Sequence, residues 1–339
     1  MKFGPVPLAQ AEGKILGHNV AGTDGKRRLR KGRALRLEDI AVLFELGRSI
    51  VYVAELEPGD VDENTAARRV ARTCCGSGLR LSGAATGRVN IIATELGLVR
   101  IDTDALHRLN AGEGVTVAVL GQHAVVQPGQ TVATVKVIPY ALAESLVGSI
   151  ESAATEPLVG VRTLEARRVG LILSGSRSVR EPLTQSFFPL VERVRSLGSE
   201  VAEQDYVDVA DEGGEEGLAS ALARQCEAGV ELIVFAGETA IMDRRDIVPR
   251  AVERAGGQVE AVGAPVDPGN LLMLGYLGEI PILGAPGCAR SRKTNVVDWI
   301  LPRLLAGDRL RRDDVTALGA GGLLEDVPER PLPRSRIRD

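Results

Sequence analysis

The sequence predicts an α/β protein, with a C-terminal doubly wound, mostly parallel sheet that follows a β-rich, mixed N-terminal region. After residue 168, continuous apolar runs of strand length alternate with amphipathic segments of helix length. This alternation is typical of a parallel sheet that helices cover on both faces. Before residue 150, short apolar runs are separated by Gly and Pro turn signals, which favours strands. We therefore predict a mixed region over 1–150, a linker over 151–167, an α/β domain over 168–310 and an extension over 311–339.

The composition is that of an ordinary globular protein. The 339 residues are 44% hydrophobic and 25% charged, with length enough for two or more domains. Aromatic residues make up 3% and the net charge is −4, which argues against a nucleic-acid or anionic-membrane partner. No apolar run reaches the roughly 18 residues of a membrane span, and the N-terminus lacks the apolar core of a signal peptide. We therefore expect a cytoplasmic protein.

The N-terminal region combines predicted helices with strands. A helix is expected from Leu37, because Glu38 and Asp39 suit its first turn, and it should end at Gly47 before a strand. A polar helix is predicted within 58–76. The following segment, 86–140, is β-rich, and its "VVQPGQTVATV" stretch predicts two strands joined by a Pro-Gly turn. Residues 141–165 predict a helix and then a linker.

The C-terminal elements follow in regular order. Strands are predicted over 168–174, 199–207, 230–236 and 258–265. Helices are predicted over 181–198, 214–229, 245–257 and 290–307. Helix ends follow from turn chemistry, with Pro182 near one start and Gly198 and Gly229 past two ends. In a parallel sheet of this kind, ligands bind beyond the carboxyl ends of the strands.

Polar and small residues gather in the loops that follow these strands. The first loop holds Ser174, Gly175 and Ser176, and Gly permits close backbone approach while Ser hydroxyls suit phosphate. A Gly-Ser loop after a strand is more often a plain turn, and both interpretations stay open.

The second loop follows the strand that ends at residue 236. It holds Gly237, Glu238 and Thr239, and then the two acids Asp243 and Asp246. Acids beside a phosphate cradle would suit Mg²⁺, which bridges carboxylate and anion. The alternative is that Asp243 and Asp246 cap the next helix.

Two Pro-Gly turns form the third loop region. Pro268, Gly269 and Asn270 precede a short apolar hairpin, and Pro286, Gly287 and Cys288 follow it. Backbone N–H groups after Gly237 and Gly287 would face the same edge as the first loop, which predicts an anion-binding cleft. Cys288 is interpreted either as a small buried residue or as a thiol activated at a helix start.

These loops carry a resemblance to a known family. "LIVFAGETAIMDRRDIVPRAVERAGG" and "PVDPGNLLMLGYLGEIPILGAPGCARS" resemble the molybdopterin-binding domain of molybdopterin molybdenumtransferases. The resemblance covers 168–306 well and 26–53 more weakly. The opening of the chain and the second string are similar to a subgroup of molybdopterin-binding proteins, some fused to a molybdenum cofactor cytidylyltransferase.

The resemblance implies molybdopterin as the ligand and molybdenum cofactor biosynthesis as the process. If this chain is a metal-inserting enzyme like others of the family, the resemblance implies that Asp243 and Asp246 are its catalytic and Mg²⁺-binding residues. The residues implied in molybdopterin binding are Ser174, Gly175, Ser176, Gly237, Glu238, Thr239, Pro268, Gly269, Asn270, Pro286, Gly287 and Cys288.

Departures from the family pattern keep more than one function open. The family's first loop has the motif Ser-Thr-Gly-Asp-Glu, and the corresponding loop here, "LSGSRS", lacks its acidic pair. In the two Pro-Gly turns, Asn270 stands where the family has Lys, and Cys288 stands where it has Asn. The first hypothesis is insertion of molybdenum into adenylylated molybdopterin. The second is a non-catalytic carrier, or a partner of a cytidylyltransferase or a molybdoenzyme. We also expect a homo-oligomer, because the insertase family that the chain resembles forms dimers, although its extra domains look replaced here. The third is a nucleotide ligand on the same architecture, although no Walker or dinucleotide-binding loop is present.

Overall fold

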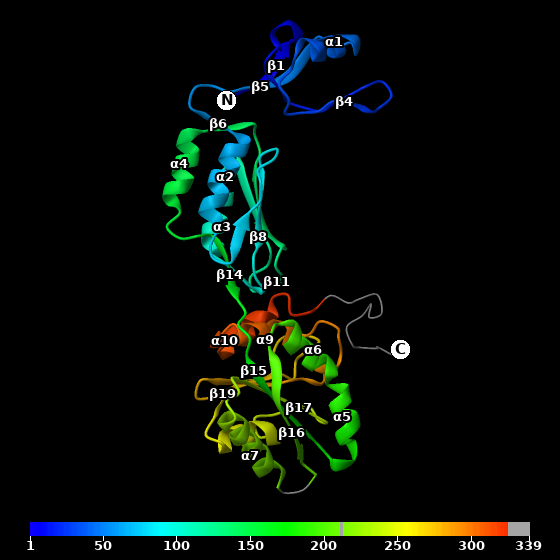
Figure 1. The fold of residues 1–339 in the computed structure, drawn as a ribbon, viewed down its shortest axis with the longest axis vertical. Helices are drawn as coiled ribbons and strands as arrows, with labels where there is room; N and C mark the ends of the chain where they lie inside the picture. The colour runs from blue at the N-terminus through cyan, green and yellow to red at the C-terminus, as the bar shows by residue number, and fades with distance from the viewer. Residues whose placement is uncertain (211–212, 325–339) are drawn as a thin grey trace, which may run out of the picture. The chain divides into compact units, whose positions relative to one another are not determined.

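The computed structural model describes residues 1–210 and 213–324 (Figure 1). They fall into an N-terminal unit, Met1–Arg162, and a C-terminal unit, Thr163–Asp339. The chain is mixed α/β, and this part of the predicted fold class is confirmed.

The N-terminal unit begins with a small antiparallel sheet. Its strands are β1 (Lys2–Pro7), β5 (Ile50–Glu55) and β2 (Ile15–Leu16), in the order β1-β5-β2. The predicted helix at Leu37 is α1 (Leu37–Glu45), and Asp39 accepts a hydrogen bond from the backbone N–H of Arg36 at its start. A short hairpin pairs β3 (Val20–Ala21) with β4 (Arg27–Leu29). Leu16, Leu35, Leu43 and Val53 belong to the core of this part.

A second core in the same unit lies under a helix-covered sheet. Helix α2 (Glu63–Cys74) packs on the sheet β10-β12-β8-β7, and Asp62 caps its start. These strands are β10 (Val115–Val119), β12 (Thr131–Val137), β8 (Arg88–Ala93) and β7 (Leu79–Leu81). Smaller elements are β6 (Asp60–Asp62), β9 (Gly97–Ile101), α3 (Thr103–Asn110), β11 (Val125–Val126), β13 (Ala141–Ala143), α4 (Glu144–Ala153) and β14 (Val159–Thr163). The β-rich segment 86–140 thus also contains the helix α3, and the predicted linker 151–167 contains the end of α4 and all of β14.

Six strands of the described residues form one sheet in the C-terminal unit. Their order is β16-β15-β17-β20-β19-β18, in which the neighbours β16, β15, β17 and β20 run parallel and β19 is antiparallel to both of its neighbours. The strands are β15 (Arg168–Gly175), β16 (Glu200–Asp208), β17 (Leu232–Gly237), β18 (Gln258–Val262), β19 (Met273–Leu277) and β20 (Ile280–Gly284). Helices α7 (Gly214–Glu227) and α8 (Ile247–Arg254) pack against each other and against this sheet. Strand β15 is buried from Val169 onward, which requires cover on both faces.

Two predicted helices differ from those observed. The segment 181–198 forms α5 (Arg180–Ser186) and α6 (Phe188–Ser196), separated at Phe187, because Pro189 has no N–H to continue the helical ladder. The last long helix was expected over 290–307, yet α9 spans Val297–Leu305 and is preceded by the 3₁₀ turn η3 (Gly287–Arg290). Asn295 explains the late start, because its Oδ1 accepts a hydrogen bond from Val297 N at 3.0 Å.

The C-terminal extension contains the short helix α10 (Arg312–Thr316). The mobile tail predicted for 325–339 lies outside the described residues. Within the residues that the structure describes, no helix has the length and apolar character needed to cross a membrane. The cytoplasmic location stays a prediction.

Candidate functional site at the carboxyl ends of β15 and β17

The loops after β15 and β17 meet at one edge of the C-terminal sheet. Ser174 on β15 is the register partner of Gly237 on β17, so the two strands end side by side. Glu238 N donates to Ser174 O at 2.7 Å. In the other direction, Ser176 donates both its backbone N–H and its hydroxyl to Glu238 Oε2, at 2.8 and 3.1 Å. Loop one therefore places two hydrogen-bond donors on one carboxylate oxygen of loop two.

A tyrosine from β16 supports the Ser176 backbone. Tyr206 Oη donates to Ser176 O at 2.6 Å, and the Arg180 guanidinium lies 5.4 Å from the Tyr206 ring centre. Burial raises the pKa of Tyr206, and the nearby charges of Glu238 and Asp208 raise that pKa further. The phenol thus stays protonated at neutral pH and remains a donor.

An arginine joins the turn after β20 to the loop after β17. Arg290 Nη2 donates to Gly237 O at 2.6 Å, and the guanidinium lies 4.8 Å from the ring centre of Phe187. Arg290 Nε is buried and has no hydrogen-bond partner within the described residues. A buried guanidinium N–H without a partner is costly, so this group is suited to an additional acceptor.

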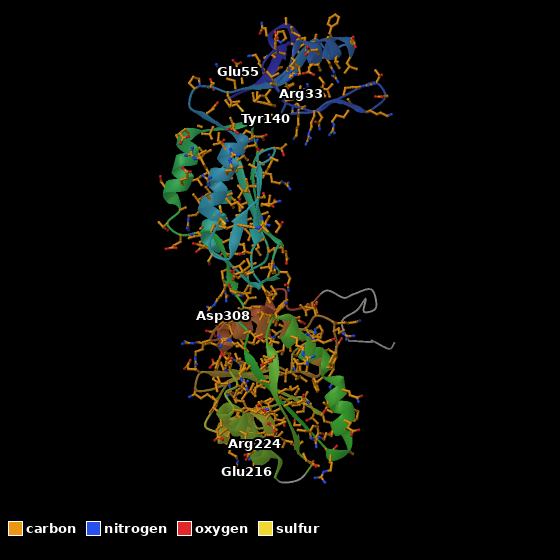
Figure 2. All side chains as sticks on the ribbon, in the orientation of Figure 1. Arg33, Glu55, Tyr140, Glu216, Arg224 and Asp308 are labelled. Atoms are coloured by element: carbon orange, nitrogen blue, oxygen red, sulfur yellow. The ribbon has the colours of Figure 1, made fainter. Side chains whose placement is uncertain are left out.

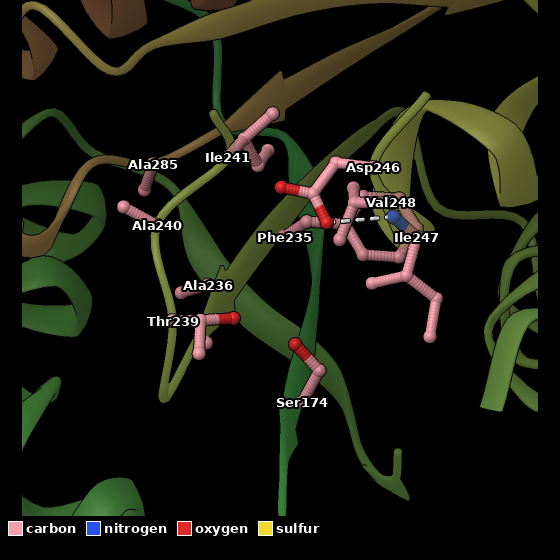
Figure 3. Close-up of a pocket in the computed structure, with 11 residues that line it drawn as sticks. Ser174, Phe235, Ala236, Thr239, Ala240, Ile241, Asp246, Ile247, Val248 and Ala285 are labelled. Carbon is pink, nitrogen blue, oxygen red and sulfur yellow. Dashed lines mark hydrogen bonds between the residues drawn. The ribbon is translucent and has the colours of Figure 1, made fainter. Parts of the chain in front are cut away.

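A small cavity lies under these loops (Figure 3). Its volume is about 10 Å³, and Ser174, Thr239 and Asp246 supply polar atoms to its lining. Figure 3 shows the Ser174 and Thr239 hydroxyls pointing toward each other. A cavity of this size holds about one water molecule. A ligand with a ring system would therefore lie on the outer edge of the loops and not within this cavity.

Asp243 and Asp246 both take part in local backbone hydrogen bonds. Asp246 caps α8, with Oδ1 accepting from Ile247 N at 2.8 Å and Oδ2 accepting from Met242 N at 3.0 Å. Asp243 Oδ1 accepts from Arg245 N at 2.8 Å. Among the described residues, no group of three or more His, Cys, Asp or Glu side chains could hold a metal ion. The capping alternative is observed for Asp246, whereas Asp243 accepts from a backbone N–H that precedes the helix. A magnesium-binding role for these two residues stays a prediction.

The two Pro-Gly turns lie at the same end of the β19-β20 hairpin, because Met273 pairs with Gly284 at that end. Residues before α9 contact both turns. Val296 N donates to Pro268 O at 3.2 Å, and Asn295 Nδ2 donates to Cys288 O at 3.5 Å.

The surroundings of the two turns differ. A Cβ on Gly269 would lie 2.4 Å from Val296 Cβ, whereas a Cβ on Gly287 would meet no atom within 4 Å. Asn270 uses its carbonyl to accept from Ala264 N, and Pro286 uses its carbonyl to accept from Ala289 N, both at 2.9 Å. The Pro268 turn is thus packed, and the Pro286 turn is open.

Sequence reasoning missed Tyr206 and Arg290. Tyr206 is one of four tyrosines in the chain and lies near the carboxyl end of a predicted parallel strand, which was an available signal. Arg290 follows the second Pro-Gly turn by three positions, but its contact with Gly237 depends on the tertiary fold. Sequence reasoning did select Ser174, Ser176, Gly237 and Glu238, which the structure brings together.

Comparisons with known proteins give weak likenesses. A domain family described as "Domain of unknown function (DUF8806)" matches residues 5–55, which is less than half of the chain. No curated protein matches the sequence.

Among solved structures, a molybdenum cofactor biosynthesis protein from Pyrococcus furiosus is similar at 13% identity and a TM-score of 0.26, over 93% of this chain and 65% of that one. A molybdopterin biosynthesis Mog protein from Mycobacterium ulcerans is 17% identical with a TM-score of 0.29, over 41% of this chain and 93% of that one. A molybdopterin biosynthesis moeA protein from Pyrococcus horikoshii is 11% identical with a TM-score of 0.27, over 90% of this chain and 74% of that one. This chain thus spans less than two thirds of the length of the first of these proteins. Scores of this size do not establish a shared fold.

Proposed function

We propose that this protein binds molybdopterin in molybdenum cofactor biosynthesis, at the edge formed by the loops after β15, β17 and β20. The observation that carries the proposal is the hydrogen-bonded junction of these loops, with Ser176 on Glu238 and Arg290 on Gly237. The resemblance of 168–306 to molybdopterin-binding domains supplies the ligand. Backbone N–H, hydroxyl and guanidinium donors at one edge are the groups that bind a phosphate.

The phosphate of the ligand would take the place of the Glu238 carboxylate. Glu238 Oε2 accepts two hydrogen bonds from Ser176, as a phosphate oxygen would. We propose that Glu238 turns away when the ligand binds and that Ser176 then donates to the phosphate. Arg290, with its unused Nε donor, would supply the positive charge.

The second Pro-Gly turn would admit the ligand, and the first would support it. The space beside Gly287 allows a phosphate to approach the backbone, while Gly269 is filled by its contact with Val296. Ser174, Gly175 and Thr239 would shape the floor of the site, and Cys288 would face the ligand with its thiol. Pro268, Gly269 and Asn270 would hold the turn without touching the ligand.

Binding and transfer fit the site better than metal insertion. The insertase hypothesis requires Asp243 and Asp246 as metal ligands, but Asp246 accepts hydrogen bonds as the cap of α8 and Asp243 accepts one from Arg245 N. No step is therefore assigned to magnesium. A carrier would pass molybdopterin or finished cofactor to a cytidylyltransferase or a molybdoenzyme.

The test separates binding from insertion in one sample. The purified chain would be titrated with molybdopterin, and then incubated with adenylylated molybdopterin, molybdate and Mg²⁺ in a single-turnover assay that reconstitutes a cofactor-free molybdoenzyme. We expect saturable binding without metallation above the protein-free control. Metallation that is lost in Asp243→Ala or Asp246→Ala would instead establish an insertase, and absence of binding would overturn the proposal.

A further inference from the structure

A large groove in the N-terminal unit has features of a second binding site. Its volume is about 1060 Å³, the size of pockets that hold small organic ligands. One wall comes from the β1 and β4 region and includes Phe3, His18, Arg30 and Lys31. The opposite wall comes from the segments around β12 and α2 and includes Lys136, Tyr140 and Glu63.

Hydrogen bonds tie the two walls together. Tyr140, labelled in Figure 2, donates its hydroxyl to Gly17 O at 2.8 Å. The N-terminal amine of Met1 forms ion pairs with Glu57 at 2.9 Å and with Asp60 at 2.8 Å. These contacts hold the two walls of the groove in a defined arrangement within the N-terminal unit.

Positive charge is concentrated in the segment that contributes Arg30 and Lys31 to the first wall. Lys or Arg occupies positions 26, 27, 28, 30, 31, 33 and 36 in a chain whose net charge is −4. Within the described residues, Arg28 pairs with Asp24 and Arg33 pairs with Asp39, but Arg30 and Lys31 form no ion pair. Both of these unpaired side chains line the groove.

A third cation approaches from the other wall. Lys136 Nζ donates to Thr86 O at 2.7 Å and lies 3.8 Å from Glu63, and both Lys136 and Glu63 line the groove. Burial lowers the pKa of Lys136, and the neighbouring charges of Lys31 and Arg88 lower it further against the opposing effect of Glu63. Glu63 attracts both Lys31 and Lys136, while the two ammonium groups repel each other. The three cationic side chains Arg30, Lys31 and Lys136 thus exceed the two lining carboxylates, Glu63 and Glu113, by one positive charge, which favours an anionic ligand.

The rest of the lining suits a flat apolar group. Phe3, His18 and Tyr140 are aromatic, and Val115, Ile138 and Pro139 are aliphatic. The Phe3 and His18 rings stand edge to face with their centres 5.7 Å apart, and Phe3 is 47% exposed. Such a surface can stack on a heterocycle.

We propose that this groove binds a phosphorylated small molecule that carries a planar ring, with Arg30, Lys31 and Lys136 holding the phosphates. A nucleotide and a pterin phosphate share this chemistry. The site is independent of the proposed function, because all of its residues belong to the N-terminal unit. A polynucleotide does not fit as well, since the overall charge is negative and aromatic residues are 3% of the chain.

Calorimetric titration of the full chain tests the proposal with ADP, molybdopterin, tripolyphosphate and a DNA duplex as probes. The variant Arg30→Glu/Lys31→Glu changes the groove, and Lys26→Glu/Arg27→Glu makes the same charge change on residues outside its lining. We expect one molecule of ADP per chain, with an affinity at least about tenfold lower in the groove variant and changed less than about threefold in the control. Molybdopterin is titrated into Arg290→Ala, so that binding at the C-terminal loops does not add to binding in the groove. Thermal unfolding of both variants establishes that they fold.

The probes test the phosphates and the planar ring of the ligand separately, and they distinguish a nucleotide from a pterin phosphate. Tripolyphosphate should bind more weakly than ADP, and Phe3→Ala should reduce only the difference between them. Tighter binding of ADP identifies a nucleotide source, and tighter binding of molybdopterin that Arg290→Ala leaves intact identifies a pterin source in this groove. Equal loss in both charge variants, preference for the duplex, or no binding of any probe at millimolar concentration would overturn the proposal. The ADP and tripolyphosphate results do not depend on the site in the C-terminal unit, and Arg290→Ala separates the molybdopterin result from it.

Discussion

The two Pro-Gly turns share a sequence pattern and one end of a hairpin, but they face different surroundings. Gly269 has φ +144° and no room for a side chain beside Val296, whereas Gly287 has open space at the same position. The first glycine is required by packing against the start of α9. The second leaves the backbone accessible near Arg290, which reaches the loop after β17. A repeated motif can thus be packed in one copy and open in the other.

The largest expected effect is on the packed turn. Gly269→Ala should lower the free energy of unfolding by about 2–4 kcal/mol, because the new Cβ meets Val296 in a backbone conformation that disfavours side chains. Gly287→Ala is the matched control and should change stability by less than about 0.5 kcal/mol. Urea denaturation of both variants measures the difference. Equal losses would remove the distinction between the turns.

The next effect concerns the open turn and its arginine. Arg290→Ala should weaken molybdopterin binding by about tenfold to a hundredfold, as expected for loss of a hydrogen-bonding charge. Arg292→Ala is the control, because Arg292 is 74% exposed and pairs with Glu192 on the surface. Fluorescence titration compares the two variants. Similar affinity in both would show that Arg290 does not contact the ligand.

The Glu238 carboxylate accepts the hydrogen bonds that we propose for the ligand phosphate, so it should compete with the ligand for Ser176. Glu238→Gln keeps the shape of the side chain but removes its negative charge, so molybdopterin should bind about three- to tenfold more tightly. A purely structural role for Glu238 would give weaker binding, because the bonds from Ser176 would be weakened without any gain. The same titration at two salt concentrations measures the electrostatic part of the change.

A smaller effect is expected at the support of loop one. Tyr206→Phe removes the hydrogen bond to Ser176 O and should cost about 1 kcal/mol of stability. Since the pKa of Tyr206 is raised, its neutral form is favoured by folding. The contribution is fully present below the ordinary tyrosine pKa and is lost as pH rises through the raised value. The free energies of unfolding of wild type and Tyr206→Phe should therefore differ at pH 7 and converge in the alkaline range.

Much of the C-terminal architecture could be predicted from local pattern. The continuous apolar runs that became β15 and β17 are long enough to be recognised without tertiary information. The break at Phe187 was missed because Pro189 was interpreted as part of one helix, although its lack of an N–H gave a local signal. The late start of α9 depends on the side chain of Asn295 and could not be found from periodicity.

The site was predictable only where residues follow strands directly. Ser176 and Glu238 were selected because both come just after predicted strands. Their mutual hydrogen bond was not predictable, because it depends on the register between β15 and β17. Arg290 was missed because its contact with Gly237 joins positions 53 residues apart in the sequence.

Hydrogen exchange measured by mass spectrometry, with and without molybdopterin, would show which loops bind the ligand. We expect slower exchange in peptides covering 174–178, 237–240 and 286–291, and unchanged exchange in the packed turn at 267–271. Protection of the packed turn alone, or no protection at any of these loops while molybdopterin is bound, would contradict the assignment of the site.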